Sequence, residues 1–161
     1  MLIEPYTAKH WPETWGILKP VFRAGETYPF APDIPENKAR TLWVDAPMAT
    51  YVALRADKMV GTFYIKPNQP ELGAHVCNCG YVVDGAARGQ GVAAQMCVFS
   101  QIEALRLGFS AMQYNLVVSS NDGAVNLWQR QGFDIIGTLP KAFMHKRLGL
   151  VDAHVMYKLL S

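Results

Sequence analysis

The sequence predicts an α/β (α+β) fold in which one mixed, mostly antiparallel sheet of about six to seven strands carries helices on both faces. Three observations lead to this fold class. Short β-branched runs of strand length recur along the chain, and amphipathic segments with helical periodicity separate them. One strand leads directly into a glycine-rich turn that opens a helix. Half of the 161 residues are apolar and 17% are charged, so we expect residues 1–161 to form a single domain.

The N-terminal part is expected to hold an edge strand and two helices. Pro5 is tolerable in the strand 2–6 only at the edge of a sheet. Pro20 should end or kink the first helix, residues 10–23, near Lys19. The apolar face of that helix is formed by residues at positions i, i+4, i+7 and i+11, namely Trp11, Trp15, Leu18 and Phe22. The second helix, residues 35–45, should turn Ala39, Leu42 and Trp43 inward.

From residue 50 onward, strands and helices alternate. Runs rich in β-branched and aromatic residues flank the turn 56–58, which indicates a hairpin. Gly108 provides a stop for the long helix that follows the glycine-rich turn. The expected strands are 51–55, 59–65, 75–83, 112–118, 133–138 and 153–160, and the expected helices are 89–107 and 123–131. Residues 139–151 are expected to separate the last two strands.

The segment 81–94 carries the strongest functional signal. Its β-branched run ends at Asp84, and Arg88-Gly89-Gln90-Gly91 opens the next helix. Glycine lets backbone N–H groups approach a ligand closely, and a helix N-terminus presents unpaired donors. Together these features favour a phosphate or pyrophosphate group, although such turns also serve as plain connectors.

Two common phosphate-binding motifs fit this turn poorly. Gly89-x-Gly91-x-x-Ala94 matches a dinucleotide-binding fingerprint, which also requires an acidic residue about 20 positions later. No acidic residue lies between Glu103 and Asp122. The Gly-Lys-Ser/Thr sequence of a triphosphate-binding loop is absent as well. Neither motif accounts for an arginine directly before the first glycine.

Two motifs together resemble the GCN5-related N-acetyltransferase (GNAT) family. The segment 88–93 resembles the family signature Arg/Gln-x-x-Gly-x-Gly/Ala. A second segment, 121–133, resembles the family pattern Asn-x-x-Ala-x-x-Leu-Tyr-x-x-x-Gly-Phe through Asn121, Ala124, Leu127, Trp128, Gly132 and Phe133. The resemblance implies a GNAT-like fold and transfer of an acetyl group from acetyl-CoA, the expected co-substrate, to an amine.

The resemblance also implies which residues bind the cofactor. In the family, the loop amides and the leading arginine bind the pyrophosphate, and the preceding strand contacts the pantetheine arm. The corresponding residues here are Arg88, Gly89, Gln90, Gly91, Val92 and Ala93 for the pyrophosphate, and Val82 and Val83 for the arm. Asn121 is expected to hydrogen-bond the cofactor, to cap the helix that follows, or to do both.

The second motif departs from the family at Trp128. Many members have a tyrosine there, whose hydroxyl can protonate the departing thiolate, whereas an indole N–H donates a hydrogen bond without acting as an acid. We therefore expect Trp128 to pack beside the cofactor thiol. Tyr114 or Tyr157 could supply the acid, although either could simply be a sheet residue.

The general base and the acceptor site are less defined. A free alkyl ammonium has a pKa of about 10.4 and must lose its proton before attack. His75 has a suitable side chain, yet a strand histidine is more often structural. Asn78 is a candidate for orienting the substrate, because part of the family that shares the Leu-Trp pair uses an amide this way. Its alternative role is to satisfy polar groups of the sheet.

The acceptor amine is expected between the loop containing Glu26 and Tyr28 and the late segment 143–147. Glu26 could pair with a cationic amine, and Tyr28 could form a wall of the pocket. Both residues could equally be exposed loop residues without a role in binding.

The net charge, the apolar segments and the cysteines limit the kinds of partner and metal that we expect. A net charge of +2 does not indicate nucleic acid, and no apolar segment has the ~18 residues that span a bilayer. Three cysteines without a secretion signal argue against a disulfide framework and indicate a cytoplasmic enzyme. His75, Cys77 and Cys79, with Cys97 or His154, could be considered as metal ligands, but the spacing is not that of a zinc pair, and we expect no metal.

Three functions remain open. The first is acetylation of a small-molecule amine, such as an amino acid, a polyamine or an amine-containing toxin. The second is acetylation of protein or peptide amines, and the third is a non-catalytic acyl-CoA-binding module. A homodimer is one possible assembly.

Overall fold

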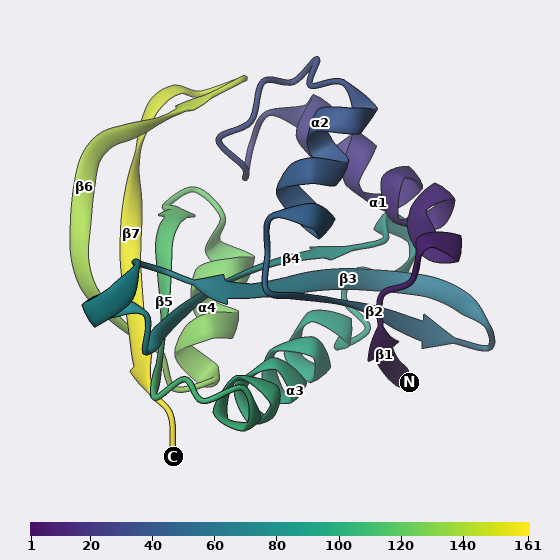
Figure 1. The fold of residues 1–161 in the computed structure, drawn as a ribbon. Helices are drawn as coiled ribbons and strands as arrows, with labels where there is room; N and C mark the ends of the chain where they lie inside the picture. Colours follow the sequence, from purple (N-terminus) through teal and green to yellow (C-terminus); the bar gives the residue numbers. More distant parts are fainter.

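A computed structural model describes residues 1–161. Its centre is a seven-stranded sheet in the order β1-β2-β3-β4-β5-β7-β6. Only β4 and β5 pair in parallel, and all other neighbouring strands are antiparallel. The predicted fold class is therefore confirmed (Figure 1). The strands are β1 (Leu2–Pro5), β2 (Ala49–Arg55), β3 (Lys58–Pro67), β4 (Val76–Val83), β5 (Ala111–Val118), β6 (Asp134–His145) and β7 (Gly149–Leu159).

Helices cover both faces of the sheet, and each face has its own apolar core (Figure 1). On one face lie α1 (Trp11–Ala24), α2 (Glu36–Arg40) and the π-helical turn Thr41–Asp45. On the other lie α3 (Val92–Arg106) and α4 (Asp122–Arg130). Side chains alternate between the faces: Phe63 of β3 joins the α3–α4 core, whereas Tyr64 joins the α1–α2 core. None of the helices combines the length and apolar character that crossing a membrane requires.

The first two helices differ from their predicted forms. α1 spans Trp11–Ala24, close to the predicted range 10–23, and of the two effects expected of Pro20, an end or a kink near Lys19, the end does not occur. Leu18 and Phe22, on either side of Pro20, are both buried against the sheet, and this packing offsets the lost hydrogen bond. The second predicted helix, 35–45, is α-helical only over Glu36–Arg40 and continues as the π-helical turn.

Two later boundaries also differ. α3 begins at Val92 instead of Gly89, because Gly89 and Gly91 take left-handed conformations with φ of 74° and 76°. Residues 139–151 do not separate two short strands but belong to one long hairpin, β6–β7, whose turn lies between His145 and Gly149. A register shift between Leu139 and Phe143 interrupts the alternation there, and most of β6 is exposed, so the sequence carries little periodic signal.

Candidate active site

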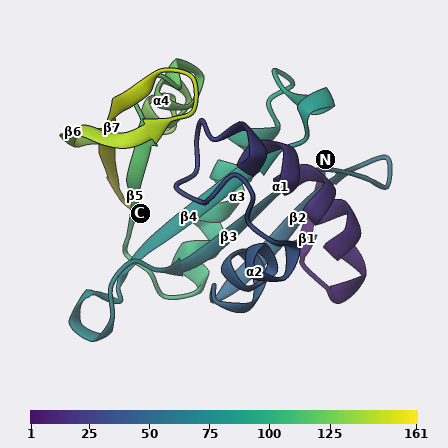
Figure 2. The ribbon, with the colours of Figure 1, turned by 90° about the horizontal axis from the view of Figure 1, so that it is seen from above.

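A large cavity opens where two strands of the sheet separate. β4 and β5 pair only at Val76–Ala111 and Cys77–Met112, and beyond these pairs they diverge (Figure 2). The cavity has a volume of about 1470 Å³ and is bordered by α1, β4, the loop before α3, β5, α4 and the tip of the β6–β7 hairpin. This volume exceeds the roughly 300–1,000 Å³ of a typical ligand pocket, so it can accommodate a large cofactor together with a second substrate.

Nearly all residues predicted for the site border this one cavity. They come from five separate segments of the chain, which the fold brings together. The cavity is lined by Glu26, Tyr28, Asn78, Val82, Val83, Arg88, Gly89, Gly91, Val92, Ala93, Asn121 and Trp128. Gln90 is the exception. Its amide oxygen accepts a hydrogen bond from Arg55 at 2.6 Å and its amide nitrogen donates to the Ala86 carbonyl at 3.0 Å, so the side chain turns away from the cavity.

The loop between β4 and α3 presents a row of free donors. None of the six backbone N–H groups from Gly89 to Ala94 has a hydrogen-bond partner within the protein. The left-handed conformations of Gly89 and Gly91 produce this arrangement, because they turn the chain into the start of a 15-residue helix. Free amides and the positive end of a helix dipole bind anions well.

Arg88 adds a charge to this row of donors. It is exposed and borders the cavity, and its guanidinium forms no ion pair or hydrogen bond with the protein. A guanidinium that is not paired within the protein is free to contact an anionic ligand in two places at once. The loop therefore fits a diphosphate group, and this fit depends on the backbone of Gln90 but not on its side chain.

Asn121 is both a helix cap and a free donor. Its Oδ1 accepts a hydrogen bond from the Ala124 N–H at 3.3 Å, which caps α4. Its Nδ2 has no protein partner and the residue borders the cavity. Both roles expected for Asn121 are therefore compatible with its geometry.

Trp128 lies in an aromatic cluster at the floor of the cavity. The indole is 8% exposed, and its ring centroid lies 5.0 Å from that of Tyr81 and 5.1 Å from that of Tyr114. The Tyr81 and Tyr114 hydroxyls are 3.0 Å apart, and Tyr81 also bonds Ser100 at 2.7 Å. Burial raises the pKa of both phenols well above the usual range, so both remain protonated donors at neutral pH. Tyr157 does not border the cavity.

Asn78 lies where β4 and β5 begin to separate. Its Nδ2 donates to the Gln113 carbonyl at 2.9 Å, and its Oδ1 accepts a weak bond from the Tyr64 hydroxyl at 3.4 Å. Asn78 thus satisfies a polar group of the sheet and still lines the cavity. His75 is exposed just before the start of β4 and does not border the cavity.

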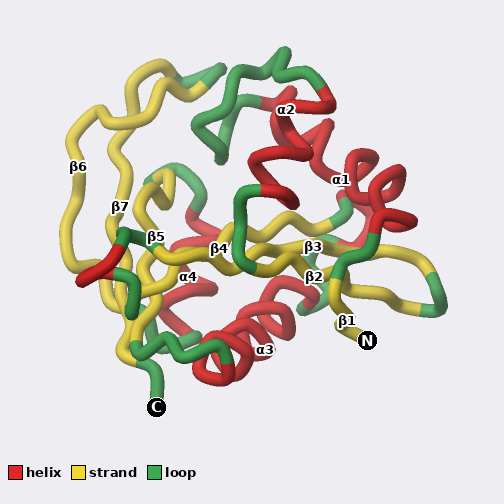
Figure 3. Tube along the Cα trace, viewed as in Figure 1, coloured by secondary structure: helices red, strands yellow, loops and turns green.

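The α1–α2 loop and the tip of the β6–β7 hairpin lie next to each other (Figure 3), and residues of both border the cavity. The Lys146 N–H donates to the Gly25 carbonyl at 3.0 Å, and Arg147 pairs with Glu26 at 2.6 Å. The Glu26 carboxylate thus already has a cationic partner. The Tyr28 hydroxyl donates to the Tyr81 carbonyl at 3.0 Å, which ties the same loop to β4. Burial raises the pKa of Tyr28 well above its usual value.

Sequence reasoning missed several residues that border the cavity. Lys66 is the most notable, because neither motif matches it; His145 also borders the cavity, and although it lies in the predicted segment 143–147 it was not singled out. On α1, Gly16 and Pro20 also line it. The spacing of four residues between a glycine and an internal proline was a usable signal, since this pair leaves one helix carbonyl without a donor.

The cysteines do not form a metal centre or a disulfide. Cys77, Cys79 and Cys97 are free and buried, whereas His75 is exposed. No three residues of the types His, Cys, Asp and Glu gather anywhere in the structure. Burial raises the pKa of the Cys97 thiol, which keeps it protonated.

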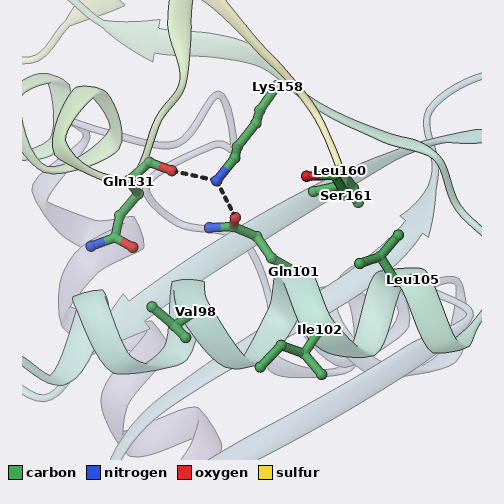
Figure 4. Close-up of a pocket in the computed structure, with 8 residues that line it drawn as sticks. All are labelled: Val98, Gln101, Ile102, Leu105, Gln131, Lys158, Leu160 and Ser161. Atoms are coloured by element: carbon green, nitrogen blue, oxygen red, sulfur yellow. Dashed lines mark hydrogen bonds between the residues drawn. The ribbon is translucent and has the colours of Figure 1, made fainter.

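A second, smaller pocket of about 270 Å³ lies on the outer face of α3 (Figure 4). Its one charged side chain, Lys158, is already occupied by structural contacts. The Lys158 ammonium donates to the Gln101 amide oxygen at 2.5 Å and to the Gln131 carbonyl at 2.7 Å. It therefore stabilises the C-terminal end of α4 and is not free for a ligand.

The fold and the cavity with its anion-binding loop define an N-acetyltransferase of the GNAT type. A model of the acetyltransferase (GNAT) family matches residues 11–133. The structure of a GCN5-related N-acetyltransferase from Kribbella flavida superposes with a TM-score of 0.93 and 39% identity, over 99% of this chain and 97% of that one. The chain belongs to the acetyltransferase (GNAT) family.

One further relative and one further solved structure are similar to this chain. N-acetyltransferase aca1 of Schizosaccharomyces pombe is 35% identical over 98 residues, which are 60% of this chain and 47% of the relative. The chain thus spans about half the length of that curated relative. A phosphinothricin acetyltransferase from Sinorhizobium meliloti, solved in complex with acetyl-CoA, has a TM-score of 0.87 at 15% identity, over 99% of this chain and 88% of that one. At that identity the similarity shows the fold.

Proposed function

We propose that this enzyme transfers the acetyl group of acetyl-CoA to the amine of a small molecule, such as an amino acid, a polyamine or an amine-containing toxin. One observation carries the proposal. A single cavity is bordered both by the loop of free amide donors and by the Glu26–Arg147 ion pair. We propose that residues 1–161 form one catalytic domain, since strands of one sheet border the whole cavity.

The cofactor end of the cavity is the loop before α3. The free N–H groups from Gly89 to Ala94 and the Arg88 guanidinium would hold the pyrophosphate. The exposed backbone edges of β4 and β5, which no longer bond to one another beyond Cys77 and Met112, are available for the amide groups of a pantetheine arm. Asn121 Nδ2 is a further free donor on the opposite wall.

Catalysis needs proton transfer and positioning at the centre of the cavity. Bound acetyl-CoA supplies a thioester carbonyl that accepts the amine and a thiolate that leaves. Tyr114 lines the cavity, and its hydroxyl, which bonds Tyr81 at 3.0 Å, is kept protonated by burial that raises its pKa; we assign it a hydrogen-bonding role and not that of the acid. Trp128 contributes an apolar wall and its indole N–H, which has no partner in the protein. Asn78 orients the acceptor from the strand edge.

A small acceptor fits the far end better than an extended chain does. The α1–α2 loop and the hairpin tip are joined there by the Lys146–Gly25 hydrogen bond and by the Glu26–Arg147 ion pair. A peptide lying across this end would have to displace both contacts. Small amines need only enter the space that these contacts enclose.

Release of the CoA thiol, measured against panels of small amines and of peptides, tests the proposal. We expect turnover with small amines and little or none with peptides. Turnover with peptides alone would favour a protein acetyltransferase. Tight acetyl-CoA binding without turnover on either panel would favour a non-catalytic acyl-CoA-binding module. Both results would overturn the proposed function.

A further inference from the structure

His145 lies at the acceptor end of the cavity with one ring nitrogen fully used. It is the last residue of β6, is 5% exposed and borders the cavity. Its Nδ1 lies 3.1 Å from the Arg147 N–H and 3.2 Å from the Leu148 N–H, so it accepts both hydrogen bonds of the hairpin turn. An imidazole nitrogen that accepts has no proton, and the ring proton therefore resides on Nε2.

The second nitrogen is a donor without a partner. His145 Nε2 forms no hydrogen bond or ion pair with the protein. Among the side-chain nitrogen and oxygen atoms that are fully shielded from solvent, only Tyr6 Oη lacks a hydrogen-bond partner. Because His145 Nε2 also lacks a partner but is not in this group, it is not fully shielded. His145 borders the cavity. It is thus a nearly buried side chain that keeps one unpartnered N–H donor beside the site.

The charges around this end favour a negatively charged group on the acceptor. The one carboxylate there, Glu26, is already paired with Arg147. Lys66 borders the same cavity without an ion pair, and its ammonium lies 5.3 Å from the centroid of the Tyr64 ring. A second ammonium, as in a polyamine, would meet an unpaired cation and no free carboxylate. A carboxylate would meet an N–H donor and an unpaired cation.

We infer that His145 is a specificity-determining residue whose Nε2–H binds a carboxylate of the acceptor, so that the enzyme selects amines of the amino-acid type. This inference rests on the proposed function and narrows its substrate class. The hairpin turn holds the ring in place, and Lys66 contributes the complementary charge. Residues 134–159, which carry the β6–β7 hairpin, lie beyond the segment that the family model matches.

Matched acceptors and two variants test the role of His145. The acceptors are the standard amino acids, their carboxamides and the corresponding decarboxylated amines. His145→Asn retains an oxygen that can accept the turn N–H groups but removes the donor at Nε2. His145→Gln provides a donor near Nε2 and loses the turn acceptor. His154→Gln is the control, because its Nδ1 bonds Thr138 at 2.9 Å and it does not border the cavity.

The wild-type enzyme should prefer an amino acid over its decarboxylated amine by at least about 10-fold in kcat/KM. His145→Asn should lose this preference through a higher KM for the amino acid, with an unchanged KM for acetyl-CoA and a nearly unchanged Tm. His145→Gln should keep part of the preference at a lower Tm. The His154→Gln control should behave as the wild type.

Two results would overturn this inference and leave the proposed function intact. The wild-type enzyme could acetylate small amines without preferring an amino acid over its decarboxylated amine. His145→Asn could instead retain the full preference of the wild type. If no amine turns over, calorimetric binding of N-acetylated amino acids in the presence of CoA replaces turnover. The inference would then be overturned if the wild-type enzyme bound N-acetylated amino acids and N-acetylated amines equally well. It would also be overturned if His145→Asn bound N-acetylated amino acids as well as the wild type does.

Discussion

At the scale of single residues, Arg88 is the side chain whose role follows most directly from its surroundings. The side chain is exposed and borders the cavity, and its guanidinium forms no ion pair or hydrogen bond within the protein. Arg88→Ala should weaken the binding of CoA by about 10-fold or more, since hydrogen bonds to charged groups contribute roughly 1.5–3 kcal/mol. Binding of a truncated pantetheine thioester, which has no pyrophosphate, should change little. Calorimetric titration of both ligands measures the difference.

A charge-matched control separates this contact from a general electrostatic effect. Arg40 is an exposed arginine on α2, lies 4.0 Å from Asp45 and does not border the cavity. Arg40→Ala should leave the affinity for both ligands unchanged. Equal losses of the two ligands in Arg88→Ala would refute the pyrophosphate contact.

Trp128 is the residue at which the chain departs from the family motif. Its ring packs between Tyr81 and Tyr114 and its N–H has no protein partner. Trp128→Phe keeps an apolar ring and removes that N–H. If the indole packs and donates one neutral hydrogen bond, the rate should fall by no more than about 10-fold. Steady-state thiol release measures it, and complete loss of activity at an unchanged Tm would contradict the packing role.

The sequence predicted these residues unevenly. Arg88, Asn121 and Trp128 belong to motifs with fixed spacing, so they could be placed before the fold was known. The segment 143–147 was expected beside the acceptor, but His145 itself could not be singled out, because its two turn hydrogen bonds depend on a hairpin whose period-two pattern is interrupted. Gln90 belongs to the motif, yet its side chain is turned away by Arg55, a contact 35 positions apart in the sequence.

At the scale of elements, the β4–α3 loop depends on two left-handed glycines. A Cβ on Gly91 would meet only a Gln95 side-chain atom, at 3.9 Å, so the cost of Gly91→Ala is mainly conformational. With φ at 76°, alanine should destabilise the protein by about 1–2 kcal/mol. It should also weaken CoA binding, because the loop amides would shift. Thermal unfolding and calorimetric titration measure the two effects.

Gly85 is the matched control in the same loop. A Cβ there would also meet nothing within 4 Å, but Gly85 does not have a positive φ. Gly85→Ala should therefore leave both the Tm and the affinity for CoA close to those of the wild type. If Gly91→Ala is equally neutral, the left-handed conformation is not what creates the anion-binding loop.

The elements themselves were predictable where burial is one-sided. The first helix and the strands on both sides of the glycine loop have clear periodic patterns and lie close to their predicted positions. Two of the differences from the prediction have physical reasons that the local sequence does not contain. Packing of Leu18 and Phe22 carries α1 past Pro20, and the exposed β6 strand gives no alternation to detect.

At the scale of the whole molecule, one buried carboxylate links α3 to the sheet. Glu103 accepts a hydrogen bond from the Tyr51 hydroxyl at 2.5 Å and two from Arg106 at 2.6 and 2.9 Å. The Arg106 hydrogen bond is the main cause of a lowered Glu103 pKa, partly opposed by burial. Burial and the bond to Glu103 raise the pKa of Tyr51 to about 12.

These shifts predict a pH-dependent contribution to stability. Because the folded-state pKa of Glu103 lies below its ordinary value of 4.5, its contribution is present above that pH and is lost as the pH falls through the folded value. Glu103→Gln should therefore lower the Tm at pH 7, and the difference from the wild type should shrink in acid. Thermal unfolding of both proteins from pH 7 to 3 measures this. A difference that persists unchanged at pH 3 would contradict it.

The sequence by itself determined the family, the anion-binding loop and the helix that follows it. These features are local: their residues lie within a few positions of one another, and backbone conformation and motif spacing are encoded there. The sequence indicated two segments for the acceptor end of the cavity, and only the tertiary structure decided which side chains meet there. That end is built by α1, the α1–α2 loop, β3, β4 and the hairpin tip, where contacts such as Lys146 to Gly25 join residues far apart in the chain. Short-range patterns in the sequence cannot specify contacts between residues so far apart in the chain.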